Sequence, residues 1–143
     1  MLQQKYRILD MLNARYIVTR DRQLITNEHA LGNAWFVDNI IYADDANGEM
    51  AALDSINPAV TAVADAKFKS ILGQSVPQKS EGDNITLTSY APNKLTYNAT
   101  SQNGGIAVFS EVYFPWGWHA SIDGKPVEIG RVNYILRALN IPA

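Results

Sequence analysis

The sequence predicts an α+β fold, with an antiparallel β-sandwich-like C-terminal half and a smaller mixed α/β N-terminal half. From residue 84 onward, short segments of alternating apolar and polar residues are separated by turn residues at roughly 8–12-residue spacing, as in antiparallel sandwiches. Before residue 73, some segments show the apolar spacing of helices and others are short β-branched runs. These two patterns assign helices to the first half and strands to both halves.

The chain fits one domain spanning 1–143, with two sub-lobes expected at 1–73 and 84–143. Its net charge of −2 gives no basic face for nucleic acid, so no nucleic-acid partner is expected. The absence of cysteine excludes disulfides, thiolate catalysis and Cys-based zinc sites. No apolar run reaches the ~20 residues that cross a bilayer, and charges interrupt the first 18 residues, so they do not resemble a signal peptide.

In the N-terminal half, we predict helices over 1–13, 49–56 and 66–72, and strands over 15–19, 34–42 and 60–64. The apolar strand over 34–42 is expected to be central, and residues 21–33 are expected to form a loop. In the second helix, Met50, Leu53 and Ile56 are expected to face inward. Gly73 is placed to end the third helix.

In the C-terminal half, strands are expected around 85–88, 95–100 and 106–113. Apolar residues at 118, 120 and 122 then alternate with polar residues at 119, 121 and 123, which predicts a half-buried strand. Asp123 and Gly124 suit a two-residue hairpin loop, because positive φ costs Gly little and is tolerated by Asp. Val127 and Ile129 are expected to continue the returning strand.

Four large aromatic residues crowd one corner of the C-terminal half: Tyr113, Phe114, Trp116 and Trp118. Such rings can stack on the apolar faces of sugars, which would make the corner a glycan platform. Alternatively, Trp118 belongs to the core and residues 115–117 form a strand corner. The residues that we select for glycan contact are Trp116, Tyr113 and His119, with Trp116 expected to be the most exposed aromatic of the four.

No catalytic residue is predicted. His119 and Asp123, four apart on one strand, would lie roughly 13 Å apart at about 3.3 Å per residue, too far for a catalytic dyad. A glycosidase would instead need two carboxylates about 5–9.5 Å apart. Glu111, Asp123 and Glu128 are the candidates for such a pair.

No metal or other cofactor is predicted. His29 and its neighbour Glu28 fall short of the three or four ligands that a zinc site needs. An oxygen-rich loop offers a calcium alternative, although its spacing departs from the EF-hand pattern. Its residues are Asp44, Asp45, Asn47 and Glu49.

Several motifs carry a resemblance, and they follow one another along the chain: MLNARYIVTR, HALGNAWFVDNI, NPAVTAVAD followed by AKFKSIL, and the segment from residue 109 to 143. In the last segment, an aromatic-Ser-Glu strand and a Tyr-aromatic-Pro-x-Gly-Trp corner precede an Ile-Asp-Gly-Lys-Pro hairpin and an Asn-Tyr-x-x-Arg-Ala strand. In this order the motifs resemble the C-terminal region of bacterial YfhO-like membrane proteins.

The resemblance implies an extracytoplasmic (periplasmic) domain at the bacterial inner membrane, tethered by transmembrane helices outside this chain. It implies a polytopic parent that transfers sugars from a lipid carrier to an envelope polymer, with its catalytic carboxylate outside this chain. The domain itself would be non-catalytic. Its expected partners are the membrane portion of the same polypeptide, which it would brace, and the acceptor glycan.

Two other functions are open at this point: a free-standing carbohydrate-binding module, and a glycosidase that uses the carboxylates named above. The segment 138–143 resembles a turn toward a further strand, and both ends of the chain resemble cuts in a longer protein. An unpaired strand edge would then favour a dimer.

Overall fold

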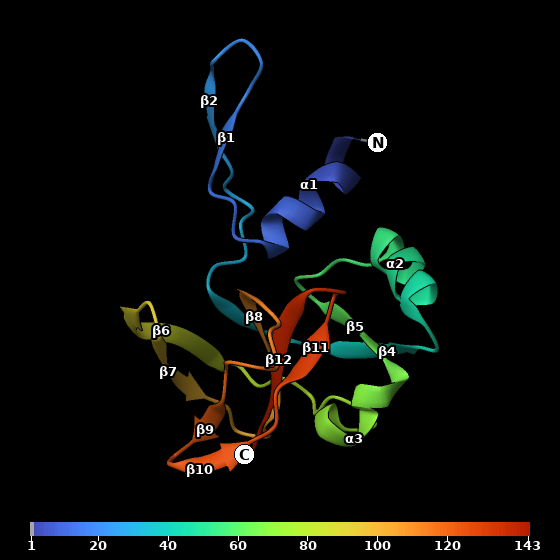
Figure 1. Ribbon diagram of the computed structural model, residues 1–143, viewed down its shortest axis with the longest axis vertical. Helices are drawn as coiled ribbons and strands as arrows, with labels where there is room; N and C mark the ends of the chain where they lie inside the picture. Colours follow the sequence, from blue (N-terminus) through green and yellow to red (C-terminus); the bar gives the residue numbers. More distant parts are fainter. Residues whose placement is uncertain (1) are drawn as a thin grey trace.

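A four-stranded antiparallel sheet lies at the centre of the molecule (Figure 1). The computed structural model describes residues 2–143, with side chains from residue 6 onward. The strand order is β11–β12–β8–β3, and the strands are β3 (Ala34–Val37), β8 (Gly105–Val112), β11 (Gly130–Val132) and β12 (Leu136–Ile141). This antiparallel sheet and its flanking helices confirm the predicted α+β class.

Strand β8 is buried on both faces because its apolar run is continuous. Ala107 and Phe109 face one layer, whereas Ile106 and Val108 face the other. All four are at most 6% exposed. The sheet is therefore the middle of three layers, and both of its faces contribute to the core.

The hairpin of β6 (Asn84–Ala91) and β7 (Lys94–Thr100) covers the first face. Ile85 and Tyr97 pack against a cluster that includes Phe36 and Phe109. The rings of Tyr97 and Phe109 meet edge to face, with centroids 4.8 Å apart. The apolar residues at 85, 87, 95 and 97 are half-buried and the threonines at 86, 88 and 96 are exposed, so the predicted alternation is confirmed there. It ends before Ala99, which is exposed.

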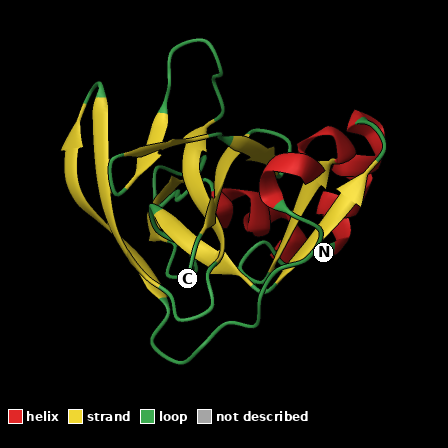
Figure 2. Cartoon of the chain, turned by 90° about the horizontal axis from the view of Figure 1, so that it is seen from below, coloured by secondary structure: helices red, strands yellow, loops and turns green. Residues whose placement is uncertain are grey.

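A parallel pair of strands, with the helices beside it, covers the second face. Strand β4 (Asn39–Ala43) pairs in parallel with β5 (Thr61–Asp65), and α2 (Ala46–Ser55) connects them. A 3-10 turn (Ala66–Phe68) and α3 (Lys69–Leu72) follow β5. Gly73 has a φ of 95° and ends α3, as predicted. In Figure 2 the helices gather on one side of the molecule and most strands on the other.

The prediction of one central strand over 34–42 is wrong. The strand is interrupted at Asp38, where the backbone N–H groups of Asp38 and Asn39 both donate to the carbonyl of Val60. β3 therefore ends as an edge strand of the antiparallel sheet, and β4 belongs to the parallel pair. Because β3 pairs with β8, residues from both expected sub-lobes share one sheet.

The prediction of a loop over 21–33 is also wrong in part. β2 (Leu24–Thr26) pairs with β1 (Tyr16–Val18) in a hairpin that follows α1 (Leu2–Met11). Arg22 supplies the turn with a φ of 60°. The run of Leu24, Ile25 and Thr26 is short and has polar residues on both sides, so the sequence pattern did not indicate a strand.

Helix α2 begins three residues earlier than predicted and turns a different face to the core. Leu53 and Ile56 are buried as expected, but Met50 is 43% exposed, so its predicted inward position is wrong. Glu49 takes the inward position instead, four residues before Leu53 on the same helix face. Asp45 caps the helix by accepting a hydrogen bond from the Gly48 amide at 2.7 Å.

Candidate functional site

A shallow depression of about 280 Å³ lies where the chain turns from β8 toward β9 (Ala120–Ile122). β9 pairs with β10 (Lys125–Val127) across the predicted hairpin, and the loop residues Asp123 and Gly124 have φ values of 49° and 79°. The lining residues come from α3, from β9 and β10 and the segments that flank them, and from β12. They are Ile71, Tyr113, Phe114, Pro115, Trp118, His119, Ala120, Val127, Glu128, Ile129 and Arg137.

The sequence creates this depression by ending β8 abruptly. Tyr113 still donates its backbone N–H to the Ile135 carbonyl at 2.7 Å. Pro115 has no N–H to continue the ladder, and residues 115–117 form a turn. The chain therefore leaves the sheet after Tyr113, and the side chains of Tyr113, Phe114 and Trp118 line the depression at this bend.

Tyr113 and His119, two of the three residues selected from the sequence, line this depression together. Tyr113 is half-buried and meets Phe68 edge to face at 5.7 Å between centroids, so its ring is fixed from behind. His119 is exposed. The structure thus places a rigid ring and an accessible polar group in one site.

Trp116, the third selected residue, does not line the depression. It is 83% exposed, which agrees with its expected exposure. Its ring lies edge-on to Phe114 with centroids 5.4 Å apart, and Phe114 is a lining residue. Trp116 therefore stands beside the depression, where it can contact whatever extends out of it.

Arg137 is a lining residue that sequence analysis missed. Its guanidinium lies 4.2 Å from the centroid of the Trp118 ring, and its Nε donates to the Val112 carbonyl at 2.8 Å. Burial lowers the pKa of Arg137, whereas the nearby Glu111 raises it. Arg137 is the arginine of the Asn-Tyr-x-x-Arg-Ala motif, but the motif does not indicate a place at the aromatic corner; the register of β12 against β8 brings it there.

The carboxylates considered for hydrolysis separate in the structure. Glu128 lines the depression, whereas Asp123 forms the hairpin turn outside the lining. Glu111 interacts electrostatically with Arg137 and Tyr97 rather than lining the depression. Burial, with a further contribution from Glu111, raises the pKa of Tyr97 to about 12. Glu128 is therefore the single member of this trio at the depression.

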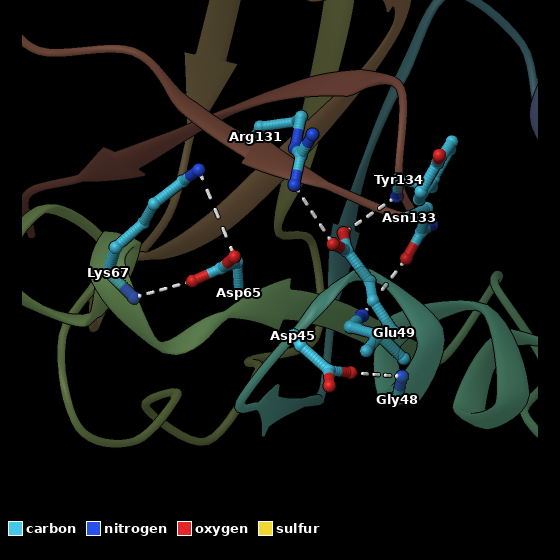
Figure 3. A network of polar contacts seen from close by, with 9 residues as sticks. Asp45, Gly48, Glu49, Asp65, Lys67, Arg131, Asn133 and Tyr134 are labelled. Carbon is cyan, nitrogen blue, oxygen red and sulfur yellow. Dashed lines mark hydrogen bonds and ion pairs between the residues drawn. The ribbon is translucent and has the colours of Figure 1, made fainter.

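A second polar cluster is built around Glu49, whose burial the sequence did not predict (Figure 3). Its carboxylate accepts hydrogen bonds from Arg131 Nη2 at 3.0 Å and from the Tyr134 amide at 2.8 Å. Arg131 also lies near the rings of Phe68 and Tyr134. Both carboxylate oxygens are thus engaged by protein groups.

Asn133 completes this cluster by joining the β11–β12 turn to β5. Its side-chain oxygen accepts a hydrogen bond from the backbone N–H of Val63 at 2.9 Å, and its backbone N–H donates to the Val63 carbonyl at 2.7 Å. Asn133 and Tyr134 both have positive φ, which the turn requires. The cluster is structural: it docks the turn onto the parallel strands.

The residues of the calcium alternative have other roles in the structure. Asp45 caps α2 and Glu49 is the buried partner of Arg131. Within residues 2–143, no group of three or more acidic, histidine or cysteine side chains is arranged to hold a metal ion. His29 lies exposed in a turn, where its amide donates to the Asn27 side chain.

Comparisons with protein-family models, curated proteins and solved structures find no match to this chain. The fold and the site thus define the class by themselves: an α+β domain with a shallow depression lined by aromatic and polar side chains. None of the helices described over residues 2–143 is both long and apolar enough to span a membrane.

Proposed function

We propose that this chain is a non-catalytic glycan-binding domain and that the depression beside β9 receives a sugar ring. One observation carries the proposal: the rings of Tyr113, Phe114 and Trp118 share a single depression with His119 and Glu128. Ligand sites typically combine an apolar wall with a few polar groups that fix orientation. Sugars present both an apolar ring face and a rim of hydroxyls.

The size of the depression limits the ligand. Its volume of about 280 Å³ lies just below the range of roughly 300–1,000 Å³ that is common for small-molecule sites. A single ring suits that space better than a long oligomer. Trp116, exposed beside Phe114, would then stack on a second ring of a longer glycan.

The arrangement of carboxylates favours binding over hydrolysis. A glycosidase needs two carboxyl groups facing each other across the bond to be cleaved. Glu128 lines the depression, but Asp123 belongs to the hairpin turn and Glu111 lies toward Arg137. Three aromatic rings, those of Tyr113, Phe114 and Trp118, belong to the lining, which suits retention of a glycan.

The wider setting in this proposal is the extracytoplasmic side of a YfhO-like polytopic membrane protein, a glycosyltransferase that uses lipid-linked sugars. Its support is the ordered set of motifs, together with the structural use of two of them. The Asp123–Gly124 pair makes the hairpin loop, and Asn133 docks the β11–β12 turn. In this setting the domain holds the acceptor glycan near the membrane portion of the same polypeptide. A free-standing carbohydrate-binding module would use the same depression.

Saturation-transfer NMR tests the proposal with a panel of hexoses, hexosamines and uronic acids and with their short oligomers as probes. We expect His119→Ala to weaken monosaccharide binding on the order of tenfold, a typical loss for one or two hydrogen bonds to a ligand. Trp116→Ala should leave monosaccharide binding unchanged but weaken oligomer binding. Tyr90→Ala is the matched control, because Tyr90 is a 70% exposed aromatic on β6 that does not line the depression.

Equal affinities for wild type, His119→Ala and Trp116→Ala would contradict the proposal and would leave the aromatic corner with a structural role only. Full-length gene sequence that lacks multiple apolar runs of about 20 residues would exclude the membrane-protein setting while leaving glycan binding intact.

A further inference from the structure

The β1–β2 hairpin extends away from the body of the protein (Figure 1), and it carries exposed apolar side chains. Tyr16, Val18 and Leu24 are 65–70% exposed. Val18 and Leu24 lie directly opposite each other in the ladder, and Tyr16 lies on the same face, two residues before Val18. Ile25, which is 45% exposed, lies on the other face. Single exposed apolar residues are ordinary, but a contiguous group such as Tyr16, Val18 and Leu24 marks an interaction surface.

The hairpin keeps its shape without burying these side chains. At its base, Asn27 Nδ2 donates to Asp10 Oδ1 at 2.8 Å and to the Ala14 carbonyl at 3.0 Å. Near its tip, the Gln23 amide donates to Thr19 Oγ1 at 3.1 Å. Isolated two-stranded hairpins are marginally stable in water, so the polar anchors, rather than packing, hold this one in place. They leave the apolar residues free for a partner.

The same hairpin concentrates positive charge. Arg15, Arg20 and Arg22 are all exposed, and Asp21 is the single acidic residue between positions 15 and 26. The hairpin therefore has a formal charge of +2 in a chain whose total is −2. The surface that complements aliphatic side chains interleaved with arginines is an anionic lipid bilayer, which offers acyl chains below and phosphates above.

We propose that the β1–β2 hairpin docks onto an anionic membrane surface, with Val18 and Leu24 entering the headgroup region and the arginines meeting lipid phosphates. The ring of Tyr16 suits the headgroup level, where its hydroxyl stays hydrated. Arginine side chains can extend along the apolar surface while their charged ends remain at the phosphates. This docking is independent of glycan binding at the β9 depression.

The absence of cysteine permits a direct test. Val18→Cys and Tyr90→Cys each place one environment-sensitive fluorophore at a position that is 70% exposed, the first in the hairpin and the second on β6. The labelled chains are mixed with phosphatidylcholine vesicles, with or without about 30% of the anionic phosphatidylglycerol. We expect the emission at position 18 to shift to the blue with the anionic vesicles alone, and the emission at position 90 to stay unchanged.

Two double variants assign the contributions. Arg20→Gln with Arg22→Gln should lower the partition coefficient about thirtyfold, from roughly fivefold per surface cation. Val18→Ser with Leu24→Ser, assayed by vesicle sedimentation, should lower it on the order of tenfold or more. High salt should weaken binding of the wild type because it screens the arginines.

Three results would overturn the inference. The first is no shift at position 18 with anionic vesicles. The second is an equal shift at positions 18 and 90, which would mean adsorption of the whole surface. The third is a shift at position 18 that needs no vesicles and grows with protein concentration, which would make the partner a second copy of the chain.

Discussion

The buried ion pair between Glu49 and Arg131 allows the sharpest test of the fold. Arg131→Met removes the cation but keeps an unbranched side chain of similar length. Glu49, which is fully buried, would then hold an uncompensated charge, with the Tyr134 amide as its remaining donor. Loss of one partner from a buried pair costs about 3–5 kcal/mol. Arg131 is 21% exposed, so we expect a loss of about 3 kcal/mol in the free energy of unfolding, at the lower end of that range.

A second substitution should rescue the first. Glu49→Gln removes the buried charge but keeps a side-chain oxygen that accepts from the Tyr134 amide. The double variant Glu49→Gln with Arg131→Met should therefore be more stable than Arg131→Met alone, by about 1–2 kcal/mol. Urea denaturation monitored by circular dichroism measures all three variants.

The exposed ion pair between Lys67 and Asp65 provides the matched control. Its nitrogen and oxygen are 3.8 Å apart and Lys67 is 62% exposed. Lys67→Met should change stability by less than about 1 kcal/mol, as surface pairs do. The reasoning would be refuted if the losses of Glu49→Gln and Arg131→Met simply add in the double variant, or if Lys67→Met costs as much as Arg131→Met.

Three further predictions concern packing and titration. Gly130→Ala should destabilise the fold by about 1–3 kcal/mol in thermal or urea unfolding. The reason is that a Cβ at this position would lie 2.7 Å from Cδ2 of the fully buried Leu72. A variant as stable as the wild type would contradict this close approach. Asn133→Ala should lower the free energy of unfolding by about 2–3 kcal/mol. The substitution leaves the buried Val63 amide without its side-chain acceptor and puts alanine at a φ of 51°. Asn133→Gly should recover part of the loss, because glycine tolerates that φ. The pKa of Tyr97 is raised to about 12, so near pH 10 the unfolded chain releases this proton while the folded chain retains it. The free energy of unfolding should therefore fall as pH rises from 10 to 12. Tyr97→Phe should flatten this part of the stability profile, and an unchanged slope would exclude Tyr97 as its cause.

The structure confirms the sequence predictions that depend on local residue types. Asp123 and Gly124 form the hairpin loop because the positive φ values that it needs are set by these two residues alone. Gly73 ends α3 for the same local reason. The half-buried alternation at residues 118–122 also needs no knowledge of the rest of the chain.

Features that depend on pairing between distant segments could not be predicted from the sequence. Glu49 looks like a surface residue until Arg131, 82 positions later, is brought beside it. Arg137 joins the depression through the register of β12 against β8. The sequence did not indicate the break at Asp38, because residues 34–42 are nearly all apolar and strands of two different sheets can have the same composition.

The aromatic corner was predicted in part: the sequence indicated its composition but not the position of each ring. Its composition indicated a glycan platform, and two of the three chosen residues, Tyr113 and His119, share one depression. The position of Trp116 beside that depression, rather than in it, follows from the turn over 115–117. A turn sets the direction of its side chains in three dimensions, which residue types alone do not specify.

The three tryptophans allow the most direct measurement of glycan binding. In a proton–nitrogen NMR spectrum each indole N–H gives its own signal: Trp118 in the depression, Trp116 beside it, and Trp35, whose indole donates to the Pro58 carbonyl at 2.9 Å. Titration with a sugar that the depression binds should shift the Trp118 signal in a saturable manner and leave the Trp35 signal in place. Equal drift of all three signals, or no movement of the Trp118 signal with any sugar of the panel, would contradict glycan binding at this site.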